Sequence, residues 1–171
     1  MKTLRNIIGV TLAGLMLVAV PFDMQAQSKK KATAEKTAEV KGMVDAQEYV
    51  FKAQTVIPMS GRTRQITSDY DLKVTKEEVV AYLPYFGRAY SAPIDPSKGG
   101  IQFTSKDFEY TATPRKKGGW EVLIRPKDAR DVQQLTLTIS ENGYGSLQVI
   151  STNRQPISFS GYITEKKETK K

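Results

Sequence analysis

Hydrophobic and polar residues alternate with a period of two along most of this chain. Apolar positions recur in short runs from residue 49 to residue 163, and Gly, Pro, Asn or Asp bounds each run. Such alternation is typical of antiparallel strands with one buried face. The positions that define the buried faces of the predicted strands are Tyr49, Phe51, Ala53, Thr55, Ile57, Tyr70, Leu72, Val74, Phe108, Tyr110, Ala112, Trp120, Val122, Ile124, Leu135, Leu137, Ile139, Leu147, Val149, Ile157, Phe159 and Ile163.

The connections between these runs are short. Asn142-Gly143 separates two of them and suits a tight turn with positive φ. Residues 114–119 and 152–156 make two further hairpin connections. A parallel crossover needs roughly a dozen residues or more, so these strands must run antiparallel. We therefore predict an all-β fold, a single antiparallel meander of about eight or nine strands that forms either a barrel or a sandwich.

Residues 82–90, which we call the aromatic segment, interrupt the alternation with Tyr-Leu-Pro-Tyr-Phe-Gly-Arg-Ala-Tyr. Pro84 and Gly87 prevent this segment from being one uninterrupted regular element. We predict a strand from Val79 to Leu83, a sharp bend at Pro84, and a return of the aromatic segment over the core.

The N-terminus has the layout of a secretory signal peptide. Lys2 and Arg5 precede an apolar run over residues 7–20, and Ala26 offers a small residue for cleavage. The run is shorter than the roughly 20 residues of a membrane-spanning helix, although an uncleaved anchor is the alternative. No Cys follows the run, which excludes a lipoprotein. We predict export to the periplasm or cell envelope, with no membrane span after cleavage.

The signal peptide leads to a division of the chain into four parts. These are the signal peptide (1–26), a polar tether (27–44), an antiparallel β domain (45–164) and a charged tail (165–171). Residues 27–39 carry no apolar side chain larger than Ala, so the tether has little to bury and is expected to be flexible or loosely helical.

His and Cys are both absent from the sequence. Their absence excludes a Cys nucleophile, a His general base, and thiolate or imidazole metal ligands. We therefore predict no cofactor and no metal site, and do not expect an enzyme. The alternative is a carboxylate-dependent hydrolase acting on envelope or dietary glycans, because two carboxylates suffice for glycoside hydrolysis. Its candidate acids are Asp69, Asp71, Glu77, Glu78, Asp107, Glu109, Asp128 and Asp131.

The aromatic segment is also the best candidate for a binding site. Its rings suit a sugar ring or another flat apolar ligand, with the phenol oxygens as polar groups. Nearby guanidinium groups would steer an acidic group or stack on a ring. The competing interpretation places the rings in the core and the guanidinium of Arg154 on loop carbonyls. The candidate ligand-binding residues are Tyr82, Tyr85, Phe86, Arg88, Tyr90, Trp120 and Arg154.

Three basic clusters, at residues 29–31, 115–117 and 166–171, contribute to a net charge of +8. Basic clusters attract polyanions, so one hypothesis is a protein whose tails bind anionic envelope polymers. The competing interpretation is solvated charge that maintains solubility. Aromatic residues are not interleaved with these clusters as in a single-strand binding groove, so we predict no nucleic-acid partner.

Five phrases are distinctive enough to suggest a family. They are Tyr49-Val-Phe-Lys-Ala53, Ser68-Asp-Tyr-Asp-Leu72, Tyr82-Leu-Pro-Tyr-Phe-Gly87, Gly100-Ile-Gln-Phe103 and Asn153-Arg-Gln-Pro-Ile-Ser-Phe159. Together they resemble a family of secreted bacterial proteins defined by a domain of unknown function, DUF4251. The resemblance implies a signal peptide followed by one such domain, and brings no activity, cofactor or catalytic residue. The leading prediction is thus a non-catalytic exported β domain that binds a small molecule, a glycan or an envelope protein.

Overall fold

The computed structural model describes residues 23–90 and 99–166, apart from the side chains of residues 23–30 and 32. Most of the predicted signal peptide and residues 167–171 of the charged tail lie outside the described residues. The described elements are α1 (Asp23–Ala46), β1 (Tyr49–Pro58), β2 (Arg64–Gln65), β3 (Asp71–Val74), β4 (Val79–Leu83), β5 (Ile101–Ser105), β6 (Phe108–Pro114), β7 (Trp120–Pro126), β8 (Val132–Ile139), β9 (Tyr144–Ser151) and β10 (Ile157–Thr164).

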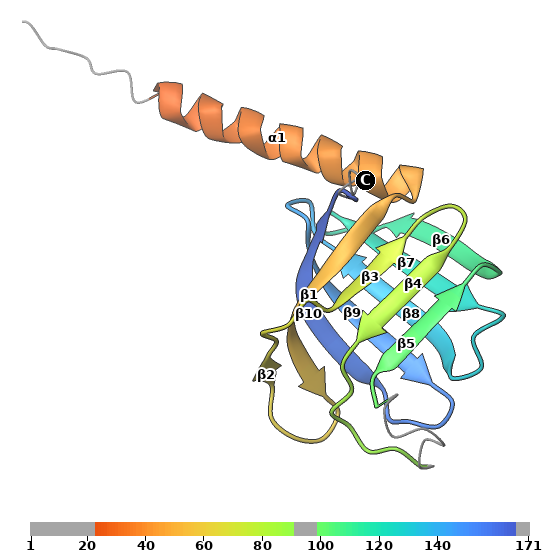
Figure 1. Ribbon diagram of the computed structural model, residues 1–171. Coiled ribbons are helices and arrows are strands. Elements are labelled where there is room, and N and C mark those ends of the chain that lie inside the picture. Colours follow the sequence, from red (N-terminus) through yellow and green to blue (C-terminus); the bar gives the residue numbers. More distant parts are fainter. Residues whose placement is uncertain (1–22, 91–98, 167–171) are drawn as a thin grey trace, which may run out of the picture.

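The strands form one antiparallel sheet that curls into a nearly closed barrel (Figure 1). Their order is β5-β4-β3-β1-β10-β9-β8-β7-β6, with β2 paired to β1. The predicted all-β fold is confirmed. Of the two predicted architectures, barrel and sandwich, the structure has the barrel. The first and last long strands, β1 and β10, pair with each other. No ladder among the described residues joins β5 to β6, so the gap in the barrel lies between these two neighbours in sequence.

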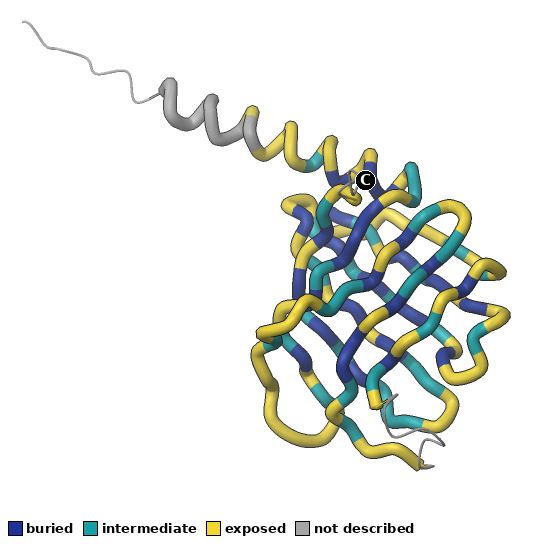
Figure 2. Tube along the Cα trace, viewed as in Figure 1, coloured by how far each residue is buried: buried dark blue, intermediate teal, exposed yellow. Residues whose placement is uncertain are grey.

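Alternate residues of most strands fill the barrel interior, as the pattern predicted (Figure 2). On β6, Phe108 and Tyr110 are only partly buried, and Ala112, predicted to face the core, is exposed. β1 departs from the prediction at its far end. Its register with β10 shifts between Ala53 and Thr55, and this bulge reverses the faces of the residues that follow. Val56 is therefore buried, and Ile57, which we had placed on the buried face, is 40% exposed.

The alternation of hydrophobic and polar residues did not predict two of the strands, β2 and β5. β2 has only two residues, too few to show any alternation. β5 follows directly on Gly99 and Gly100, and only Ile101 and Phe103 mark its inner face. Gly100 is required there, because a Cβ at this position would lie 2.6 Å from the backbone oxygen of Leu83 on β4.

Helix α1 covers one end of the barrel, which we call the helix end (Figure 1). The helix takes in the whole of the predicted tether (27–44), and Val40, Met43 and Val44 near its C-terminus are buried against the core. The helix ends at Ala46, and the positive φ of 54° at the next residue, Gln47, lets the amide of Glu48 donate back to the Met43 carbonyl. In the described part of the chain, no helix combines the length and the apolar character needed to cross a membrane.

Candidate functional site

The aromatic segment lies across the opposite end of the barrel, which we call the mouth. β4 ends at Leu83 as predicted, and the chain then runs beside the connection between β9 and β10. The amide of Tyr90 donates to the Asn153 carbonyl, and the amide of Gln155 donates to the Arg88 carbonyl. The chain bends at Gly87, three residues after the predicted bend at Pro84. The return of the segment is seen in its pairing with the β9–β10 connection and in Tyr85, which is partly buried against the core.

Tyr85 fixes the middle of the aromatic segment. Its hydroxyl lies 2.7 Å from the Arg88 carbonyl oxygen and 3.1 Å from that of Gln155, so it can donate to either. The ring folds back over Gly87, where a Cβ would lie only 2.6 Å from the Tyr85 hydroxyl. Partial burial raises the pKa of Tyr85 above its ordinary value, so the phenol remains a donor further into the alkaline range.

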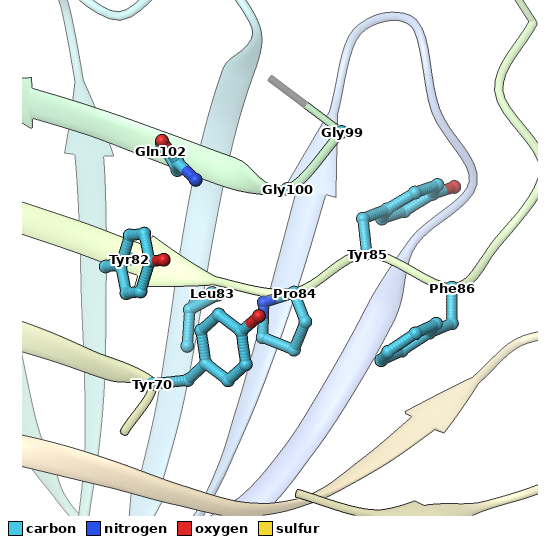
Figure 3. Close-up of a pocket in the computed structure, with 9 residues that line it drawn as sticks. All are labelled: Tyr70, Tyr82, Leu83, Pro84, Tyr85, Phe86, Gly99, Gly100 and Gln102. Carbon is cyan, nitrogen blue, oxygen red and sulfur yellow. The ribbon is translucent and has the colours of Figure 1, made fainter. Parts of the chain in front are cut away.

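A shallow depression of about 360 Å³ opens on the outer surface beside the mouth (Figure 3). Tyr70 and Tyr82 stack at one side of it, with ring centroids 5.1 Å apart. Tyr85 and Phe86 project at the other side, and Pro84 lies between the two groups (Figure 3). The lining residues are Tyr70, Tyr82, Leu83, Pro84, Tyr85, Phe86, Gly99, Gly100 and Gln102.

The register of the sheet explains why these side chains face outward. Lys52, Asp71, Tyr82 and Gln102 are successive partners across β1, β3, β4 and β5, so they share one face. That face is the outer one, because Leu72 and Leu83, the next residues along β3 and β4, are fully buried. The Lys52 ammonium lies 2.9 Å from the Asp71 carboxylate, and this hydrogen bond raises the pKa of Lys52.

Two guanidinium groups stand against the aromatic rings of the depression. Arg64 on β2 lies 5.1 Å from the ring centroid of Phe86, and Arg154 lies at the same distance from that of Tyr85. Arg154 also donates to the carbonyl oxygens of Gly99 and Gly100, at 3.1 and 2.9 Å. It thus ties the β4–β5 connection to the β9–β10 connection, as the competing interpretation of a guanidinium on loop carbonyls predicted.

The structure brings together only part of the predicted binding set. Tyr82, Tyr85 and Phe86 line the depression, and Arg154 supports its wall. Arg88 and Tyr90 are exposed but are not among its lining residues. Trp120 is misplaced by the prediction: it pairs with Ile139 on β8 at the helix end and packs on the core there.

The sequence analysis did not select Tyr70, Gln102 or Arg64 for the site. Tyr70, which we predicted to lie on a buried face, is partly buried against the core, and it also stacks on the outward-facing Tyr82. The outward position of Gln102, between Ile101 and Phe103, was the one local signal that could have placed it.

Several of the candidate carboxylates have structural partners. Besides Asp71, the Glu109 carboxylate lies 3.2 Å from the Lys127 ammonium. Asp128 accepts hydrogen bonds from the amides of Lys106 and Asp107 in the β5–β6 turn, and hydrogen bonding lowers the pKa of its carboxyl. Among the described residues, no group of three or more acidic side chains is arranged to hold a metal ion.

Fold and site together define a class: a small antiparallel β barrel with an exposed aromatic depression beside its mouth. The chain belongs to the family described as a domain of unknown function (DUF4251), whose model matches residues 21–163. A crystal structure of a DUF4251 family protein from Bacteroides eggerthii DSM 20697 has a similar fold, with a TM-score of 0.58 and 16% sequence identity. That similarity covers 80% of this chain and 91% of the other. No curated protein matches the chain.

Proposed function

We propose that this chain is a non-catalytic binding domain, exported to the periplasm or cell envelope, that holds a sugar ring of a glycan in the aromatic depression. The observation that carries the proposal is the exposure of large rings around one hollow. Tyr82 is 47% exposed although it belongs to the core strand β4, and Phe86, three residues beyond the end of β4, is 45% exposed. Clustered exposed apolar groups on a folded protein mark interaction sites.

The chemistry of the lining suits a sugar. Aromatic side chains pack against the apolar face of a sugar ring. The depression has two pairs of aromatic side chains, one on each side: Tyr70 with Tyr82, and Tyr85 with Phe86. The Gln102 amide supplies donors and an acceptor, and the phenol oxygens of Tyr70 and Tyr82 add two hydroxyl groups. The mixture favours a ligand with one apolar face and a hydroxylated rim.

Thermal unfolding of the purified protein with a panel of neutral and acidic oligosaccharides tests the binding. A ligand at a hundred times its dissociation constant stabilises the folded state by roughly 2.7 kcal/mol, so the melting temperature rises by several degrees. We expect Tyr82→Ala to abolish that rise. Tyr144→Ala is the matched control, because Tyr144 is an exposed strand tyrosine, 60% accessible, at the helix end. Equal losses in both variants, or no rise with any glycan, would contradict the proposal.

Export has its own support and its own test. Lys2, Arg5 and the apolar run over residues 7–20 make the positive and apolar regions of a signal peptide. We expect cell fractionation to recover the protein outside the cytoplasm, with a mass that corresponds to cleavage after Ala26. A cytoplasmic protein that retains Met1 would refute export and leave the binding proposal untouched.

A further inference from the structure

The charges around the depression are unevenly distributed. None of its lining residues carries a charged side chain, so its charge preference is set by the residues that contact the lining. Near Tyr70 and Tyr82, the acidic Asp71 is paired with Lys52 at 2.9 Å, and Asp69 is exposed. Two carboxylates against one ammonium leave these three residues with a net negative charge.

Among the described residues, basic side chains lie on the side formed by Tyr85 and Phe86. Arg64 stands over the Phe86 ring and Arg154 over the Tyr85 ring, each 5.1 Å from the centroid. Arg88 follows the two rings in sequence and is exposed. Within residues 23–90 and 99–166, neither Arg64 nor Arg88 forms an ion pair with an acidic side chain.

The stacking of Arg64 leaves its hydrogen-bonding capacity available. A guanidinium has five N–H donors in its own plane, and contact with an aromatic ring occupies only one face of that plane. The same donors match the two oxygens of a carboxylate in a bidentate arrangement. A guanidinium fixed over Phe86 can therefore bind a carboxylate on a ring that packs in the depression.

We propose that the sugar held in the depression is a uronate, a hexose ring that carries a carboxylate, with its acidic group directed toward Arg64. This inference rests on the proposed function and specifies its ligand class. Tyr70 and Tyr82 would pack on the ring, Gln102 would bond its hydroxyl groups, and Arg64, assisted by the positive potential of Arg88, would bind the carboxylate.

Titration calorimetry with matched oligosaccharides tests the inference. The probes are tetramers of galacturonate and of glucuronate, each as the free acid and as the full methyl ester, which keeps the ring and removes the charge. Because exposed charge pairs contribute modestly, we expect at least one free acid to bind about fivefold more tightly than its ester at low ionic strength. About 0.5 M salt should remove most of the difference.

Two arginine variants locate the effect. Arg64→Gln should remove the difference in affinity between the acid and its ester. Arg125→Gln is the matched control, because Arg125 is an exposed strand arginine on β7. Esters that bind as tightly as acids, with both lost in Tyr82→Ala, would overturn the uronate and keep the proposed function. Binding of none of the four probes would overturn the uronate, and the proposed function would then be decided by the neutral oligosaccharides of the thermal-unfolding panel. Binding that Tyr82→Ala does not affect would overturn both.

Discussion

The two ends of the barrel are closed in different ways. At the helix end, Tyr110 donates to the Val44 carbonyl at 3.1 Å, and its oxygen lies 3.4 Å from that of the fully buried Tyr49. At the mouth, Phe86 remains 45% exposed, and the buried Oε1 of Gln155 accepts no hydrogen bond within the described part of the chain. The helix end thus buries its rings and pairs their hydroxyls, whereas the mouth leaves its rings accessible.

The strongest test of this comparison removes one ring from each end. Tyr49→Ala should reduce the free energy of unfolding by about 3–5 kcal/mol, because it empties a fully buried site. Phe86→Ala should reduce it by less than about 1 kcal/mol, because the ring is partly solvated already. Urea denaturation measures both values. A loss with Phe86→Ala as large as that with Tyr49→Ala would show that the mouth is core and carries no free surface.

Glycines at the two ends give a second test, of intermediate size. Gly87→Ala would place a Cβ 2.6 Å from the Tyr85 hydroxyl, so the ring must move and lose its bond to a loop carbonyl. We expect a loss of about 1–2 kcal/mol in urea denaturation, and weaker glycan binding. Gly42→Ala, in α1 with no atom within 4 Å of the new Cβ, should instead stabilise the protein by about 0.5–1 kcal/mol. If both variants changed the free energy of unfolding in the same direction, the two ends would not differ in how closely side chains pack around these glycines.

The difference between local and long-range contacts explains what the sequence could predict. The strand that ends at Leu83 and the turn at Gly143, whose φ is 86°, both depend on neighbours in sequence. The stack of Tyr70 on Tyr82 and the contact of Arg64 with Phe86 depend on which strands pair and in which register, and alternation does not encode that. Trp120 was misplaced for the same reason, because a period of two identifies a buried face and not an end of the barrel.

The smallest expected effect is a pH dependence that also separates the two ends. Burial, with a contribution from the neighbouring Tyr110, raises the pKa of Tyr49 well above its ordinary value, and partial burial raises that of Tyr85. In the unfolded chain these phenols ionise near pH 10, so above that pH the unfolded state gains charge that the folded state resists. Stability should therefore be complete below about pH 9 and fall as the pH rises toward 11.

A buried phenol that stays neutral costs about 1.4 kcal/mol for each pH unit above 10, until it ionises in the folded state too. Tyr49→Phe should remove most of this alkaline loss, whereas Tyr85→Phe, at the more open mouth, should remove less. Urea denaturation from pH 8 to pH 11 gives the slope for each protein. An unchanged slope in Tyr49→Phe would contradict the account, because it would mean that the phenol at the helix end ionises as freely in the folded barrel as in the unfolded chain.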